Sequence, residues 1–254
     1  MNLRGFWLFS AAFLFAVPVL SQAASDPVLK VAHTSGTGYP LVTLDGNRVN
    51  GGLLRDLGEL IALRLGTRAQ HVLMPRGRME KAIEVGEAHI VCYSSPGWSS
   101  GAVGNWTRHV LPQIERAVTL AENAPPQKTP DDFIGKRMAV MTGYHFAPIQ
   151  PLFERGETQR VNDTKVENLF QRVKHGQADA LIASEAEIEG YFKQRPKERA
   201  RYAIGRLPFT VVQTQCLVSP RSPWSVAAIN TALAEMEQAG EIERLARRYG
   251  MSVR

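Results

Sequence analysis

The chain has 254 residues, a formal net charge of +6 and two cysteines. That length is enough for one large domain or two smaller ones, which can bury sufficient apolar surface to fold without metals or several disulfides. The positive charge is scattered and interleaved with glutamates, as in KQRPKER and RLARR, and no aromatic-basic motif accompanies it. We therefore expect no nucleic-acid partner.

Residues 1–23 have the pattern of a cleaved signal peptide. Arg4 provides the positive start, a long apolar run follows, and Ser21 and Ala23 form a small-x-small cleavage site. The apolar run falls short of the ~20 residues that a membrane-spanning helix needs. The sequence therefore predicts export to the periplasm, with a mature chain that begins just after Ala23.

Five segments after this point alternate between strand and helix patterns. In chain order they read strand, helix, strand, helix and strand: PVLKVAHT, LLRDLGELIALRLG, RAQHVLM, RMEKAIEVG and HIVCYS. The first helix has leucines at three- and four-residue spacing and ends on Gly66, and the second helix ends on Gly86. This alternation predicts an α/β lobe with a largely parallel sheet. The segment DGNRVNGG, before the first helix, is expected to form turns.

The second half of the chain repeats this order. It reads as a strand at 138–141, a helix in YHFAPIQPLFERG, a short strand in RVNDT, a helix in VENLFQRVKHG, a strand in ALIAS and a helix in EAEIEGYFKQR. The segments VGEAHIV and HGQADALIAS have the same form, in which a helix-ending glycine and a tight turn precede a strand. We therefore expect a second α/β lobe.

The last third of the chain is expected to return to the first lobe. FTVVQTQCLV reads as a strand, and two helical segments separated by a glycine follow it. The chain would then cross between the lobes twice, at 115–122 and 207–214. The predicted division is lobe 1 at 24–117 plus 212–254 and lobe 2 at 118–211.

The two cysteines, Cys92 and Cys216, both lie in apolar runs. An oxidising compartment would permit a disulfide between them. Two buried free thiols would be equally ordinary, and the sequence leaves both possibilities open.

Five segments together resemble the family 3 periplasmic solute-binding proteins, the polar-amino-acid type that serves ABC transporters. They are GGLLRDLGELIALRLG, RMEKAIEVGEAHIV, DDFIGKRMAVMTG, HGQADALIASE and INTALAEMEQAGEIERLARRYG, in that order. The resemblance implies a type II clamshell, in which two α/β lobes are joined by two hinge strands. It also implies a small ligand in the cleft between the lobes, with closure on binding.

Candidate ligand contacts in lobe 2 follow a predicted strand. Thr142, Gly143 and Tyr144 stand after that strand and before a predicted helix. The amino end of a helix presents unpaired N–H groups and a positive partial charge, which suit a carboxylate or another anion. The alternative is that these are plain turn residues.

Candidate contacts in lobe 1 follow its third strand and an earlier loop. Ser94, Ser95 and Trp98 come directly after the strand and are expected to reach the same cleft. Tyr39 occupies the place where the resemblance implies an aromatic wall for the ligand. Each of these, too, could be an ordinary turn residue.

Two departures from the family weaken any inference about the ligand. Glycine stands where the resemblance implies an arginine that grips an α-carboxylate, and Ser184 stands where it implies an aspartate that meets an ammonium group. Each missing charge-assisted contact would be worth ~1.5–3 kcal/mol. Arg76 or Arg78, in MPRGRM, could supply the missing cation, although both could equally be solvated residues at a helix start.

No catalytic, metal-binding or cofactor motif stands out. The six histidines are spread singly, and neither a P-loop nor a nucleophile elbow occurs. We therefore predict a monomeric binding protein rather than an enzyme, which captures a small amino-acid-like or anionic ligand for an inner-membrane ABC permease. The alternatives are a dehydratase acting on prephenate or arogenate, with Glu185 or His145 as the acid, or a ligand-sensing accessory module.

Overall fold

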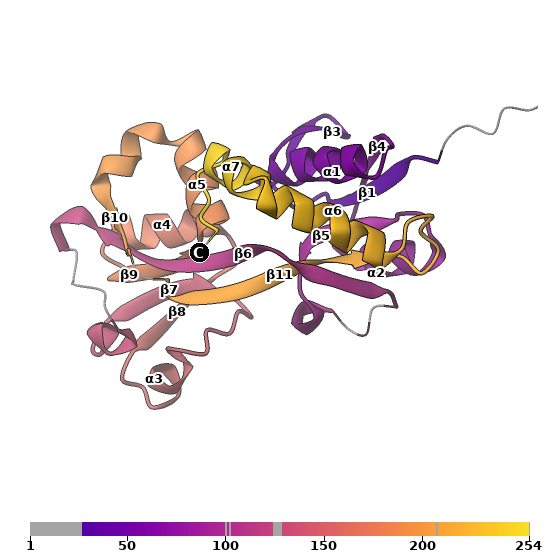
Figure 1. Ribbon diagram of the computed structural model, residues 1–254. Helices are drawn as coiled ribbons and strands as arrows, with labels where there is room; N and C mark the ends of the chain where they lie inside the picture. The colour runs from indigo at the N-terminus through magenta and orange to yellow at the C-terminus, as the bar shows by residue number, and fades with distance from the viewer. Residues whose placement is uncertain (1–26, 100, 102, 124–128, 207, 254) are drawn as a thin grey trace, which may run out of the picture.

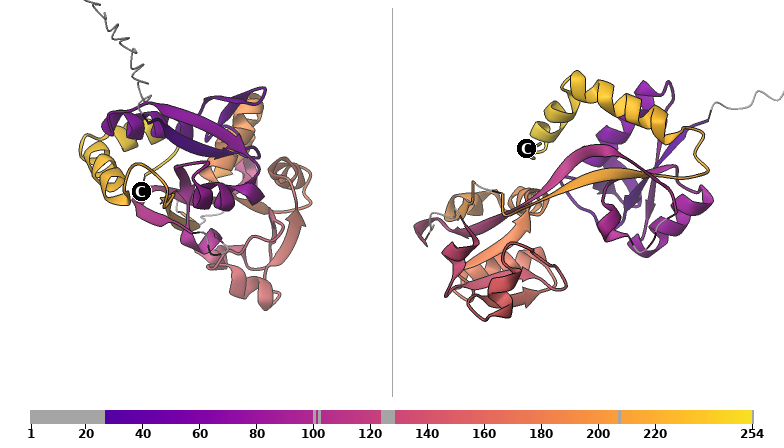
Figure 2. Two further views of the ribbon diagram at one scale, coloured as in Figure 1. Left: turned by 90° about the vertical axis from the view of Figure 1, so that its right-hand side faces the viewer. Right: turned by 60° about the horizontal axis from the view of Figure 1, so that its bottom comes forward.

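The computed structural model describes residues 27–99, 101, 103–123, 129–206 and 208–253. The predicted signal peptide lies outside these residues. Two bodies, hereafter lobe 1 and lobe 2, are joined by two long strands that run side by side (Figure 1; Figure 2, right). Among the described residues, the helices are all too short or too polar to cross a lipid bilayer.

Lobe 1 is formed by the amino-terminal segments and the carboxy-terminal helices. Its strands and helices are β1 (Leu29–Thr34), α1 (Leu53–Arg64), β4 (Ala69–Met74), α2 (Arg76–Val85), β5 (Ile90–Ser94), α6 (Val226–Gln238) and α7 (Glu241–Arg248). A small hairpin of β2 (Thr43–Asp45) and β3 (Arg48–Gly51) and the short 3-10 turn η1 (Pro96–Trp98) complete it. The return of the last two helices to this lobe agrees with the prediction.

Lobe 2 is formed by the middle of the chain. Its main elements are β7 (Arg137–Met141), α3 (Gln150–Glu154), β8 (Gln159–Asp163), α4 (Val166–Lys174), β9 (Ala180–Ser184) and α5 (Glu185–Gln194). Smaller elements are β10 (Tyr202–Ile204) and the 3-10 turns η2 (Ala121–Asn123), η3 (Pro130–Phe133) and η4 (Pro196–Arg201).

The connecting strands are β6 (Asn105–Leu120) and β11 (Thr210–Val218), and they make the sheet continuous through both lobes. The described sheet has nine strands, in the order β4-β1-β5-β11-β6-β9-β7-β8, with β10 on the far part of β6. In this sheet β1 pairs in parallel with β4 and β5, and β7 with β8 and β9, whereas β11 is antiparallel to β5 and β6, and β6 is antiparallel to β9 and β10. Two parallel sets joined by two crossing strands are the predicted architecture; the exact lobe boundaries stay a prediction.

Each lobe has its own apolar core. Leu53, Leu57 and Ile61 form the buried stripe of α1 and pack in the main cluster of lobe 1. Lobe 2 is built around aromatic rings, with Phe170 stacked on Tyr191 at 3.7 Å between ring centroids. Ala186 is an exception, because it belongs to α5 of lobe 2 but packs in the lobe 1 cluster.

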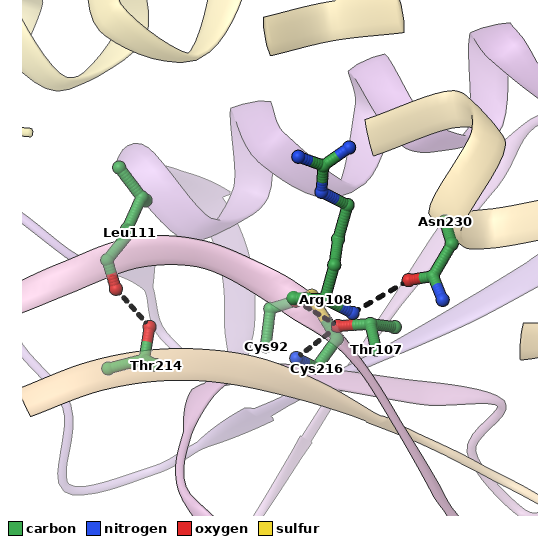
Figure 3. Close-up of a disulfide and its surroundings, with 7 residues drawn as sticks. All are labelled: Cys92, Thr107, Arg108, Leu111, Thr214, Cys216 and Asn230. Carbon is green, nitrogen blue, oxygen red and sulfur yellow. Dashed lines mark hydrogen bonds between the residues drawn. A yellow bond between two sulfur atoms is a disulfide. The ribbon is translucent and has the colours of Figure 1, made fainter. Parts of the chain in front are cut away.

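A disulfide joins Cys92 of β5 to Cys216 of β11 (Figure 3). The backbone N–H of Cys216 donates to the Thr107 hydroxyl of β6 at 2.8 Å, so three neighbouring strands meet at this point. The bridge therefore fastens a lobe 1 strand to a strand that continues toward lobe 2. Of the two possibilities that the sequence left open, the structure has the disulfide.

Two local predictions were wrong for identifiable reasons. The helix expected from Tyr144 onward begins only at Gln150, because Pro148 and Pro151 lack the N–H groups that an earlier start would need. Pro151 is tolerated because it stands in the first turn of α3. The segment expected to form only turns contains the β2–β3 hairpin, whose connection includes Gly46 at a φ of 57°.

Candidate functional site

Three neighbouring strands place polar side chains in one row where the lobes join. Glu115 of β6 is the direct partner of Ser184 on β9 and of Thr210 on β11. Residues paired in this way present their side chains on the same face of a sheet. The Thr210 hydroxyl donates to Glu115 Oε2, and Glu115 is only 8% exposed. We call Ser184, Glu115 and Thr210 the junction row.

Glu187 is folded back onto this row by the start of α5. Its carboxylate accepts hydrogen bonds from the backbone N–H and the hydroxyl of Ser184, both at 2.8 Å, while the Ser184 hydroxyl accepts from the N–H of Glu187. This is a capping box, which explains why α5 begins at this Ser-x-x-Glu sequence. The helix start therefore delivers a second carboxylate to the row.

Both carboxylates are less acidic than an ordinary glutamate. Burial raises the pKa of Glu187, and hydrogen bonds from Ser184 offset only part of the rise. Burial also raises the pKa of Glu115; the Thr210 hydrogen bond opposes the rise and the charge of Glu187 adds to it. The charge of Glu187 therefore makes ionisation of Glu115 harder.

Two tyrosines, one from each lobe, lie within reach of these charges. Tyr93, near the end of β5, has its pKa raised by burial and then by Glu187, Glu185 and Glu115. Burial raises the pKa of Tyr144 in lobe 2 as well, and Glu187 and Glu115 add to it. Side chains from both lobes thus converge on the junction row.

Tyr93 is exceptional in two further respects. Its hydroxyl oxygen is buried and has no hydrogen-bond partner among the described residues. Its backbone has a φ of 60°, a conformation that costs free energy for a residue with a side chain. Unpaired buried groups and strained backbone cluster at functional sites, so both observations mark this tyrosine.

The lobe 2 segment predicted to seat an anion is arranged differently from the expectation. The N–H and the hydroxyl of Thr142 donate to the Asp163 carbonyl at 2.8 and 3.0 Å, and the N–H of Tyr144 donates to the Met141 carbonyl. Residues 142–149 form turns and irregular backbone, so the predicted helix amino end at Gly143 was wrong. The charges of Glu187 and Glu115 nevertheless act on the Tyr144 hydroxyl and add to the rise in its pKa.

The lobe 1 candidates lie after β5 as predicted. Ser94 is buried opposite Gln215, directly after Tyr93, and the Ser95 hydroxyl caps η1 by accepting from the N–H of Gly97. Trp98 is 38% exposed. Contact of Ser94, Ser95 and Trp98 with a ligand stays a prediction.

The two arginines proposed as ligand cations have partners within the protein. Arg76 donates to the Trp98 carbonyl at 3.1 Å. Arg78 forms an ion pair with Glu87 at 2.6 Å on the surface. A ligand anion would therefore compete with contacts that already exist.

Tyr39 lies against helix α5. Its ring is 5.2 Å from the ammonium of Lys193, and its carbonyl oxygen would be 2.6 Å from a Cβ added at Gly190. Only glycine permits this close approach between a lobe 1 loop and a lobe 2 helix. Tyr39 also lines a surface pocket of about 380 Å³ with Phe192 and Arg199, and its role as a wall for the ligand stays a prediction.

The residues suggested for the enzyme alternative are placed less favourably. Glu185 forms an ion pair with Arg116 at 2.6 Å and accepts hydrogen bonds from the backbone and side chain of Ser252, so it is engaged in holding the carboxy-terminal tail. His145 is exposed. Within the described residues, no cluster of histidine, cysteine and acidic side chains could hold a metal ion.

Sequence reasoning missed Glu115, Glu187 and Tyr93. The Ser-x-x-Glu spacing could have found Glu187, because a capping box directs its glutamate back toward the serine. Glu115 lay within a predicted crossing, but its pairing with Ser184 depends on the order of the strands. The conformation of Tyr93 had no sequence signal.

Comparisons with known proteins bear on the fold. No protein family and no curated protein matches the sequence. An ancestral cationic amino acid solute-binding protein has a similar structure, with a TM-score of 0.69 at 19% identity, over 87% of this chain and 95% of its own. The GluR0 ligand-binding core in complex with L-glutamate has a TM-score of 0.67 at 15% identity, over 89% of this chain and 99% of its own.

A third similar structure is an ancestral amino-acid-binding protein described as a precursor of cyclohexadienyl dehydratase. Its TM-score is 0.61 at 18% identity, over 87% of this chain and 94% of its own. At such identities the likeness concerns the fold. The chain has the type II periplasmic binding protein fold, which its resemblance to the family 3 solute-binding proteins implied.

Proposed function

We propose that the chain is an exported, monomeric solute-binding protein. It captures a small polar ligand between its lobes and delivers it to an inner-membrane ABC permease. The signal-peptide pattern supports export, and the resemblance to the family 3 proteins supports the permease as partner. The amino-acid ligands of structurally similar proteins support a ligand of that size.

One observation carries this proposal: side chains of both lobes converge on the junction row. Tyr93 belongs to a lobe 1 strand and Glu187 to a lobe 2 helix, yet the charge of Glu187 raises the pKa of Tyr93. A ligand that contacts both groups binds best when the lobes are together. Binding is therefore coupled to closure about β6 and β11.

A thermal-shift panel tests the proposal. Amino acids, small dicarboxylates and small amines are added singly to the mature protein, and the unfolding temperature is measured. At least one compound should stabilise the folded state, by about 2.7 kcal/mol when its concentration is a hundred times Kd. A panel without any stabilising compound would contradict a solute-binding role.

The alternative from another class is a dehydratase on the same scaffold. The raised pKa values of Glu115 and Glu187 favour it, because a carboxyl with a raised pKa keeps its proton to higher pH, as a general acid requires. Incubation with prephenate or arogenate distinguishes the two functions. Formation of an aromatic product would show that the chain is an enzyme. If the substrate stays unchanged, the binding function remains the proposal.

A further inference from the structure

Two carboxylates lie together here, Glu115 of the junction row and Glu187 beside it, and the described residues provide no matching cation. Burial, hydrogen bonds from Thr210 and Gln113 and the charge of Glu187 shift the pKa of Glu115, whereas burial and the hydrogen bonds from Ser184 shift the pKa of Glu187; no lysine or arginine is among these groups. The nearest arginine along β6, Arg116, alternates to the other face and pairs with Glu185. Two neighbouring carboxylates without a cation disfavour each other's charged form.

The Tyr93 hydroxyl provides a second, independent observation. It comes from the opposite lobe, its oxygen is buried, and it has no hydrogen-bond partner within the described residues. The charges of Glu187, Glu185 and Glu115 all act on this hydroxyl and add to the rise in its pKa that burial causes. A phenolic oxygen can accept a hydrogen bond from an N–H group, as can both carboxylates. All three groups are therefore suited to one donor-rich cation.

Four of the groups that could hold a ligand carboxylate already have partners within the protein. Arg76 donates to a backbone carbonyl and Arg78 is paired with Glu87. In lobe 2, the N–H groups of Thr142 and Tyr144 donate to backbone carbonyls. These four groups, which would favour an α-carboxylate, are thus used within the protein. Glu115 and Glu187, which would favour a cation, have no lysine or arginine partner among the described residues.

We propose that the ligand is an organic cation without a carboxylate, a protonated amine or a guanidinium compound, held between Glu115 and Glu187 with the Tyr93 hydroxyl as a further partner. This inference rests on the proposed binding function and narrows its ligand class. The positive charge of the cation offsets the repulsion between the two carboxylates, so that they need not bind protons. Because its partners come from both lobes, it also stabilises the closed arrangement.

Matched pairs of probes test the ligand class by isothermal titration calorimetry. Agmatine and arginine differ by one carboxylate, and so do putrescine and ornithine; glutamate serves as an acidic probe. We expect agmatine or putrescine to bind at least tenfold more tightly than its carboxylated counterpart, and glutamate not to bind. Tighter binding of arginine, ornithine or glutamate would overturn the inference and leave the binding function intact.

Substitutions test the site with the same probes. Glu115→Gln and Glu187→Gln keep the side-chain shape, and glutamine also serves in a capping box, so both variants should fold. Each should lose about ten- to a hundredfold in affinity for the cation, as expected for a lost charge-assisted contact. Glu154→Gln, on the exposed surface of α3, is the matched control and should bind as the unaltered protein does.

Tyr93→Phe separates a ligand contact from a structural role. Removal of an unpaired buried hydroxyl should leave the unfolding temperature unchanged or raise it, while affinity for the cation falls severalfold. Unchanged affinity in Glu115→Gln and Glu187→Gln would refute the site. If the probes fail but another compound in the thermal-shift panel binds, only the cation inference is wrong; if nothing binds, the proposed function fails as well.

Discussion

Glu187 has a structural and a chemical role at the same time. Its carboxylate completes the capping box of α5, which lowers its pKa, but its burial raises that pKa by more. A carboxyl that is harder to ionise in the folded protein than in the unfolded chain destabilises the fold at neutral pH. Burial of this side chain therefore costs free energy of folding that a helix cap alone would not cost. Functional residues commonly have such a cost.

Asp163 shows the opposite behaviour at the start of α4. Its carboxylate accepts from the Asn168 side chain, from the Arg172 guanidinium and from the backbone of Thr164 and Lys165, and these bonds lower its pKa to about 2. A lowered carboxyl pKa stabilises the fold above the unfolded value of 3.8, and the contribution is lost as pH falls toward about 2.

Asp163→Asn should therefore destabilise the protein by about 1 kcal/mol at pH 7, because it removes the negative charge that pairs with Arg172. The difference from the unaltered protein should shrink as pH falls from about 4 toward about 2, because Asp163 is protonated first in the unfolded chain and only later in the folded protein. Urea unfolding at a series of pH values measures it. Asp45→Asn, at an exposed position of β2, is the control; a difference for Asp163→Asn that stays constant with pH would contradict the account.

Individual residues of the site were predictable only where local sequence determined them. Ser184 was named because the resemblance implies an aspartate at its position, and its contact with a ligand stays a prediction. Glu187 was within reach of local sequence, since a capping box is a local motif. Glu115 and Tyr93 were not, because one depends on which strands are neighbours and the other on a backbone conformation that no residue pattern specifies.

The helices and strands themselves followed closely from periodicity and glycine position. The helix ends at Gly86 and Gly176 have positive φ values, which explains why the same phrase recurs in both lobes. Strand β6 is the main underestimate: its 16 residues include Pro112, which argues against a strand. Pro112 is accommodated opposite Gln213, just before the register of β11 shifts.

The disulfide makes a prediction about β5 and β11. It closes a chain separation of 124 residues, and a long closed loop restricts the unfolded chain strongly. Replacing both Cys92 and Cys216 by serine should lower the free energy of unfolding by about 2–5 kcal/mol. Urea unfolding measures this loss.

Reductant supplies the control for the disulfide. The unaltered protein in dithiothreitol should unfold at the same urea concentration as the double-serine variant, which should not respond to reductant. Equal stability of the oxidised protein and the variant would mean that the bridge does not support the join between β5 and β11.

At the scale of the whole molecule, the lobes meet at more than the two crossing strands. Helix α5 follows a lobe 2 strand, but Ala186 packs in the lobe 1 core and Glu185 binds Ser252 of the carboxy-terminal tail. Farther along the helix, Gly190 admits the Tyr39 carbonyl. The start of α5 is therefore a further contact between the lobes, in addition to β6 and β11.

The order of elements was enough to predict two lobes and two crossings, because repeated strand–helix units and a returning tail leave few arrangements. It could not predict how the lobes face each other. That arrangement brings Tyr93 to Glu115 and Glu187 and leaves Arg78 with Glu87. The predicted ligand chemistry therefore changed once the facing side chains were known.

A crystal structure of the protein grown with agmatine tests the central claim most directly. The account predicts density for agmatine between the lobes, with its cation in hydrogen-bonding distance of Glu115, Glu187 and the Tyr93 hydroxyl. Density confined to one lobe, such as the cavity of about 410 Å³ lined by Phe133 and Asp179, would contradict it. So would a junction row filled by the protein's own side chains, with no room for a ligand.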